Sequence, residues 1–130
     1  MISKRILIDA RFYGIEHAGL GRYTINLIRE LSRQDKINQY LILLRKRYFN
    51  ELNLPNNWQK ILADEQHYTF LEQLLIPKLI LNQKPDIFHA LHTNVPIFYS
   101  GKLIITVHDL TQNQRDSRAT TLSGPLYFLK

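Results

Sequence analysis

The sequence predicts an α/β domain in which a parallel sheet is covered by helices. Short apolar runs alternate along the chain with longer segments of helical period, which is the pattern of strands joined by crossover helices. Hydrophobic residues make up 45% of the chain and charged residues 22%, as in folded globular proteins. The 130 residues fit one domain and are enough to bury a core. We therefore expect a single domain over residues 1–130.

The first half of the chain contains the clearest helix, which lies between two predicted strands. The first strand is residues 6–8, and a fully buried strand is expected at residues 40–44. Between them a helix begins near Gly19 and ends near Asp35. Its apolar positions recur at i, i+3, i+4, i+7, i+8 and i+11, and they are Leu20, Tyr23, Thr24, Leu27, Ile28 and Leu31. This stripe predicts a helix that packs on the sheet.

The second half of the chain continues the alternation of strand and helix. A short strand is expected at residues 60–63, a helix at residues 69–81, and strands at residues 87–90 and 102–107. Pro77 should kink the helix, because proline cannot donate the backbone hydrogen bond of a helix interior. Residues 124–129 begin an apolar helix. A helix this short needs a partner surface, so we expect more chain to follow.

Composition and charge limit the function. The chain has no cysteine, which excludes a disulfide framework and thiolate chemistry and favours the cytoplasm. We expect no secretion signal and no membrane span, because charged or polar residues interrupt each apolar run. Membrane contact is then at most peripheral, at the inner membrane face.

The net charge of +6 favours anionic partners. The basic cluster at residues 45–47 is interpreted as a solvated strand end, and no nucleic acid is expected because interleaved aromatic residues are lacking.

Gly19 and Gly21 open the first helix and suggest an anion site. A dinucleotide fingerprint would need a third glycine where Thr24 stands, and it would follow its strand directly. A nicotinamide-dependent oxidoreductase is therefore a weaker alternative. Glycines still let a ligand approach the backbone, and unpaired N–H groups at a helix start favour an anion. A flexible loop whose glycines only relieve steric crowding explains the same residues.

Three histidines lie at predicted strand ends. His108 and Asp109 follow the apolar run at residues 103–106, where a buried strand meets solvent, and open α/β sheets bind ligands at that edge. A neutral imidazole there, with a carboxylate beside it to orient a proton, suits a polar substrate. His89 is either a packed, hydrogen-bonded histidine or a substrate contact. His89 and His92 have zinc-like spacing but no third ligand nearby, so we expect no metal.

Several motifs in their natural order resemble the N-terminal half of glycosyltransferase family 4. The motifs cover nearly the whole chain, and they are Asp9-Ala10-Arg11, Gly19-Leu20-Gly21-Arg22-Tyr23, Glu72-Gln73 with Pro77, Asp86-Ile87-Phe88-His89-Ala90-Leu91-His92 and Thr106-Val107-His108-Asp109-Leu110-Thr111. The resemblance implies a GT-B enzyme, in which two Rossmann-like domains face each other across a cleft. It further implies metal-independent transfer of a sugar from a nucleotide-sugar donor, with retention of anomeric configuration, in polysaccharide biosynthesis.

The resemblance also assigns roles to individual residues. This half would be a Rossmann-like parallel sheet with helices on both faces, and it would hold a glycan or lipid-linked acceptor. The glycine segment, Gly19, Leu20, Gly21 and Arg22, would form the loop that approaches the donor diphosphate. His108 would contact the transferred sugar and assist the transition state, with Asp109 beside it. His89 and His92 would line the acceptor cleft. No cofactor is implied, since the nucleotide sugar is a substrate.

The family's second domain, which carries most donor contacts and a spaced pair of glutamates, is not among these 130 residues. Glu65 and Glu72 have a similar spacing but lie in the acceptor-side half, so they cannot replace that pair. We therefore expect the isolated chain to be inactive. Its expected protein partners are a separately encoded C-terminal half or a second copy of itself. The alternative is a non-catalytic remnant or binding module that retains the fold.

Overall fold

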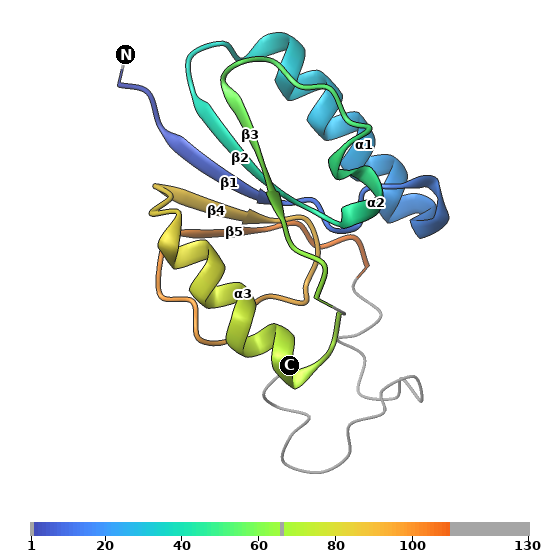
Figure 1. The fold of residues 1–130 in the computed structure, drawn as a ribbon, viewed down its shortest axis with the longest axis vertical. Coiled ribbons are helices and arrows are strands. Elements are labelled where there is room, and N and C mark those ends of the chain that lie inside the picture. The colour runs from blue at the N-terminus through green and yellow to red at the C-terminus, as the bar shows by residue number, and fades with distance from the viewer. Residues whose placement is uncertain (1, 66, 110–130) are drawn as a thin grey trace.

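The computed structural model describes residues 2–65 and 67–109, which form a five-stranded parallel sheet in the order β3-β2-β1-β4-β5 (Figure 1). The strands are β1 (Arg5–Asp9), β2 (Gln39–Leu44), β3 (Trp58–Leu62), β4 (Ile87–Ala90) and β5 (Leu103–Ile105). The chain starts at the centre, adds β2 and β3 on one side, and returns to add β4 and β5 on the other. The point of reversal lies between β1 and β4, where open α/β sheets form a crevice. The predicted α/β class with a Rossmann-like sheet is confirmed.

Helices cover both faces of this sheet, as predicted. Helix α1 (Ala18–Gln34) connects β1 to β2, and α3 (Phe70–Asn82) connects β3 to β4. They lie on opposite sides of the sheet in Figure 1. The two remaining helical segments, η1 (Ile15–His17) and α2 (Lys46–Phe49), are short and lie near the ends of β1 and β2.

Alternate residues of the central strands face the two helices and build two cores. On the α1 side, Ile28 packs with Ile8 and Ile42. On the α3 side, Ile76 packs with Leu7. Each of these side chains is at most 2% exposed, and fully burying one such side chain contributes roughly 1.5–3 kcal/mol. The α1 stripe read from the sequence is the face that makes this contact.

Helix α3 begins one residue later than predicted, because Thr69 is its N-cap. The hydroxyl of Thr69 accepts a hydrogen bond from the backbone N–H of Glu72 at 3.1 Å, which satisfies one of the N–H groups left open at a helix start. Pro77 lies inside the helix and is buried.

Two strand predictions need correction. β3 starts at Trp58, not at residue 60, because Trp58 pairs with Tyr40 and their rings stack at 4.2 Å. The predicted strand at residues 102–107 is shorter, and it was wrongly expected to be buried: β5 residues are 37–49% exposed. Among the described residues β5 is an edge strand paired only with β4, and neither apolar core includes it. The apolar helix expected at residues 124–129 lies outside the described residues.

Candidate functional site

The carboxyl edge of the sheet brings the start of α1 together with the segment after β5. The ring of Tyr23, in the second turn of α1, packs edge-on against the ring of His108, with centroids 4.8 Å apart. The prediction that the glycine segment and His108 share one edge is therefore confirmed. They share it because parallel strands end on the same side of a sheet.

His108 is exposed but fixed in orientation by one hydrogen bond. Its Nε2 lies 2.7 Å from the backbone carbonyl oxygen of Leu91. A carbonyl oxygen only accepts, so Nε2 carries the proton and donates. In the neutral ring Nδ1 is then the lone-pair nitrogen, and it can accept a hydrogen bond from a ligand hydroxyl or take a proton. Asp109 follows at the last described position.

His89 takes part in a small hydrogen-bonded group at the same edge. Its Nε2 lies 2.9 Å from the hydroxyl of Thr106, and that hydroxyl lies 3.5 Å from the hydroxyl of Tyr23. Burial lowers the pKa of His89 and so favours its neutral ring. The structure thus shows the packed, hydrogen-bonded histidine that the sequence left as one of two alternatives, and the contact of His89 with an acceptor stays a prediction.

The two glycines of α1 have different environments. A Cβ on Gly21 would lie 1.8 Å from the backbone oxygen of Gly14, so Gly21 is required for the β1–α1 connection to pack on the helix. A Cβ on Gly19 would have nothing within 4 Å. Both residues already lie in the helix, together with Leu20 and Arg22, so the expectation of a loop approaching the ligand is corrected to a first helical turn.

The first turn of α1 carries no negative charge of its own. Its N-cap, His17, makes no side-chain capping hydrogen bond, and no acidic residue lies in the first turn. Glu16 lies just before the helix, with its Oε1 3.9 Å from Nε2 of His17, and its carboxylate accepts from Arg47 and Tyr48. The partial positive charge of a helix start favours an anion there.

His92 is buried, with both ring nitrogens used by the protein. Its Nδ1 accepts a hydrogen bond from the backbone N–H of Asn94 at 3.1 Å. The proton is therefore on Nε2, which lies 3.2 Å from Oδ2 of Asp9. At 4% exposure His92 is buried, and its two hydrogen bonds connect the segment after β4 to the end of β1. Its predicted contact with an acceptor finds no support in this geometry.

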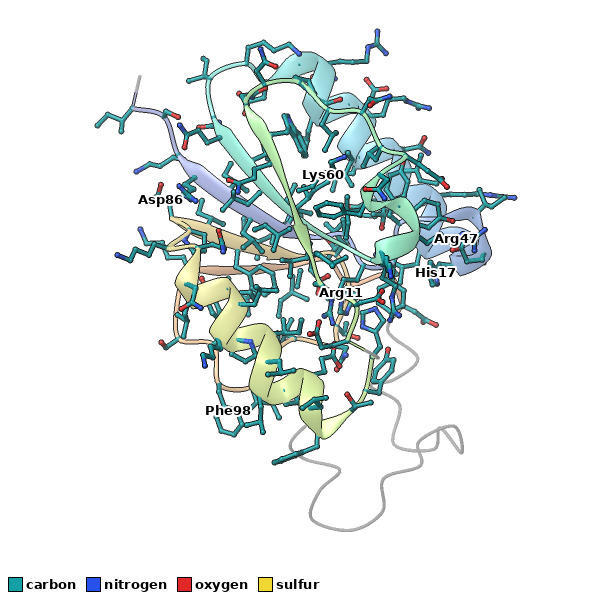
Figure 2. The ribbon with its side chains drawn as sticks, in the orientation of Figure 1. Arg11, His17, Arg47, Lys60, Asp86 and Phe98 are labelled. Atoms are coloured by element: carbon teal, nitrogen blue, oxygen red, sulfur yellow. The ribbon has the colours of Figure 1, made fainter. Side chains whose placement is uncertain are left out.

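A buried ion cluster lies behind the edge, and the sequence reasoning assigned it no function. Arg11 donates to the two carboxylate oxygens of Asp9 at 2.8 and 2.6 Å, and its Nη1 lies 2.8 Å from Oε1 of Glu72. All three side chains are at most 1% exposed. Figure 2 shows Arg11 at the strand ends, between the sheet and α3. The cluster joins β1 to α3 where the candidate site begins.

Both carboxylates of the cluster are ionised. Burial alone would raise the pKa of Asp9, but the adjacent Arg11 guanidinium outweighs it and holds that pKa well below its usual range. Burial would also raise the pKa of Glu72, but hydrogen bonding to His67 and the charge of Arg11 lower it to about 2. Two carboxylates around one guanidinium leave one net negative charge, which the surrounding hydrogen-bond donors stabilise.

Glu72 is the centre of that hydrogen bonding. Its Oε2 accepts from the backbone N–H of Tyr68 at 2.7 Å and from the side-chain amide of Asn94 at 3.0 Å. Its Oε1 lies 3.2 Å from Nδ1 of His67, whose ring stacks on Phe12 at 4.0 Å. These contacts hold Tyr68 in a left-handed conformation, with φ of 63°, which costs energy in a residue with a side chain. A Thr-x-x-Glu capping pattern at residues 69–72 was the available sequence signal for Glu72.

The basic cluster after β2 is partly paired. Arg47 donates to Oε1 of Glu16 at 3.2 Å, and the Tyr48 hydroxyl donates to Oε2 at 2.6 Å. Figure 2 shows Arg47 near His17 at this end of the molecule. Lys46 and Arg47 are exposed, as the interpretation of residues 45–47 as a solvated strand end expects. Arg45 differs, because it is half-buried and its Nη2 lies 3.4 Å from the backbone oxygen of Glu65.

Within residues 2–65 and 67–109, no group of three or more His, Cys, Asp or Glu side chains could hold a metal ion. A hollow of about 380 Å³ lies at the opposite, amino-terminal edge of the sheet, where Arg5, Gln39 and Trp58 contribute to its lining. No helix in the described part of the chain is long and apolar enough to cross a membrane. None of the family models, curated proteins or solved structures compared with the chain matches it.

Proposed function

We propose that this chain is the acceptor-side half of a retaining glycosyltransferase, which transfers a sugar from a nucleotide sugar to a glycan or lipid-linked acceptor. The observation that carries the proposal is the contact between Tyr23 of α1 and His108 after β5. It places an uncapped helix N-terminus and an oriented imidazole at one sheet edge. The family resemblance of the motifs that contain these residues supports the same function.

The proposed roles follow from the geometry of each group. The N–H groups at the start of α1 attract the donor diphosphate, and the open space beside Gly19 lets it approach. His108 donates through Nε2 to the protein, so Nδ1 is the nitrogen that accepts a hydrogen bond from a sugar hydroxyl. A donor held this way reacts faster because the reacting groups are already positioned. A second domain facing this edge would exclude water from the cleft.

The alternative is a non-catalytic binding module, and it too has support. Gly21 is required by its contact with Gly14, and His92 by its contacts with Asp9 and Asn94. Folding alone would therefore preserve these residues of the motifs. Gly19 and His108 are different, because no packing contact explains Gly19 and His108 is exposed.

A binding measurement tests the proposed donor site. We would titrate the chain with a panel of nucleotide sugars and follow the backbone amide signals of residues 18–22 by NMR. Gly19→Val fills the open space beside the helix start and should bind about tenfold more weakly, the equivalent of about 1.4 kcal/mol. Asn26→Val changes an exposed position farther along α1 and should bind as the wild type does. Equal binding by Gly19→Val, or no response to any nucleotide sugar, would contradict the donor site.

A further inference from the structure

The hollow at the amino-terminal edge of the sheet, which we call the amino-edge hollow, has a largely polar lining. Its volume of about 380 Å³ is that of a small-molecule site, which typically measures roughly 300–1,000 Å³. Arg5 is the charged side chain of the lining. The amide and serine side chains are Ser3, Gln39, Asn56, Asn57 and Gln59, and the aromatic ones are Tyr40 and Trp58. The hollow therefore surrounds a single cation with hydrogen-bonding groups.

Arg5 reaches the hollow from the side of the sheet that carries α3. Leu7, two residues further along β1, belongs to the core on that side together with Ile76 of α3, and side chains two residues apart in a strand share a side. Arg5 and Gln39 are partners in the register of β1 and β2, so their side chains leave the sheet together. Figure 1 shows the starts of β2 and β3 away from α3, and the residues that line the hollow lie outside that helix.

The guanidinium of Arg5 has no partner among the described residues. Its Nε is buried without a hydrogen bond, and so is the indole Nε1 of Trp58. Asp86 accepts a hydrogen bond from the backbone N–H of Arg5 at 2.8 Å, but it forms no ion pair with the side chain. Nearly all buried polar groups in folded proteins have a partner. A water molecule can accept one hydrogen bond, but only an anion also balances the charge of Arg5.

The edge around the hollow carries more positive than negative charge. Among the described residues, the first position of each strand and the four positions before it contain the cations Lys4, Arg5, Lys36, Lys84 and Lys102 and the carboxylates Asp35 and Asp86. Asp35 already accepts a hydrogen bond from the hydroxyl of Tyr40 at 2.7 Å. The last turn of α1 adds Arg33, which pairs with Glu30. The charge at this edge therefore favours an anion.

We propose that the amino-edge hollow binds a small hydroxylated oxyanion, such as a sugar phosphate or a sugar acid. Arginine presents two parallel N–H groups that match two oxygens of a phosphate or a carboxylate, so Arg5 pairs with the charged group. The exposed amides of Gln39 and Gln59 bind the hydroxyls. The hollow lies at the edge opposite to His108, so this second site goes beyond the proposed function and does not depend on it.

Fluorescence of Trp58 tests the proposal, because Trp58 is the only tryptophan of the chain and lines the hollow. The full chain is titrated at physiological salt with glucose 6-phosphate, glucuronate and uncharged glucose. A saturable change with glucose 6-phosphate alone identifies a phosphate ester as the ligand class, and one with glucuronate alone identifies a carboxylate. A change with both identifies either oxyanion. No response to the two charged sugars, or an equal response to glucose, would overturn the proposal.

Variants of Arg5 locate the binding. Arg5→Met removes the paired N–H groups and should weaken binding about tenfold or more. Arg5→Lys keeps the charge without the planar guanidinium and should restore only part of the affinity. Arg33→Met is the matched control, because it removes the same charge from a side chain that is 72% exposed on α1. It should bind as the wild type does.

The stability of Arg5→Met separates ligand binding from a structural function of Arg5. Because the substitution removes a buried donor that has no partner, the variant should unfold at the denaturant concentration of the wild type or at a higher one. A clear loss of stability would show that Arg5 supports the fold and would overturn the proposal. Binding by Arg5→Met equal to that of the wild type would do the same.

Discussion

The ring of His108 packs edge-on against the ring of Tyr23, with centroids 4.8 Å apart. These residues lie far apart in the sequence, and the parallel sheet brings them together because β1 and β4 are neighbours and β5 follows β4. The contact connects the start of the first helix to the last described segment. It is the relationship on which the candidate site depends.

Replacing His108 with alanine should lower sugar transfer by roughly a hundredfold or more when the chain works with a donor-binding domain, because a positioned proton-transfer or electrostatic group is lost. The fold should survive, since His108 is exposed. Turnover numbers and thermal unfolding of both proteins check this. Wild-type turnover in a variant of equal stability would show that His108 has no catalytic function.

Gly21→Ala should destabilise the protein by about 1–3 kcal/mol, because the new methyl group would overlap a backbone oxygen that cannot move away alone. Gly19→Ala is the matched control in the same helical turn. It should be neutral or stabilise by about 0.5 kcal/mol, since alanine favours helix and space is open there. Denaturant unfolding of the two variants measures the difference. Equal stability of the two would contradict the packing role of Gly21.

Glu72→Gln should cost about 1–3 kcal/mol of unfolding free energy, because the amide nitrogen of glutamine cannot accept hydrogen bonds from the donors that surround the buried carboxylate. The exposed Glu30, which pairs with Arg29 and Arg33, provides the control. Glu30→Gln should unfold at nearly the same denaturant concentration as the wild type. If Glu72→Gln also unfolded at the denaturant concentration of the wild type, the cluster would not hold α3 to β1.

Acid should unfold the protein through the same cluster. The pKa of Glu72 is lowered from 4.5 to about 2 in the folded state, so the folded protein binds fewer protons than the unfolded chain between these values. Its contribution to stability is present above pH 4.5 and is lost as pH falls towards 2. Asp9 acts in the same direction. The unfolding free energy of Glu72→Gln should therefore depend less on pH in this range. An unchanged pH dependence would contradict the ionised state of Glu72.

The sequence alone predicted the helices and strands that a local hydrophobic pattern specifies. The α1 stripe and the run at residues 40–44 predicted their helix and strand to within about two residues at each end. The predicted burial of the last strand was wrong, because β5 is an edge strand among residues 2–65 and 67–109. Position within a sheet is a non-local property. An apolar run has the same composition at an edge as at the centre.

Only part of the candidate site could be predicted from the sequence, for a similar reason. Strand ends locate His89 and His108, since parallel strands finish on one side. The contact of Arg11 with Glu72 joins residues far apart in the chain, and no local pattern pairs them. The two glycines look alike in sequence, and only the position of Gly14 shows that one is needed for packing.

The most direct test of the central claim is a sugar-transfer assay of the purified chain with a panel of nucleotide sugars. The chain would be assayed alone and mixed with a family 4 C-terminal domain, with His108→Ala as the control in both cases. We predict transfer only in the mixture, because positioning two substrates across a cleft is worth roughly 7–11 kcal/mol and one wall cannot provide it. Steady transfer by the chain alone, above the His108→Ala control, would contradict the half-enzyme account.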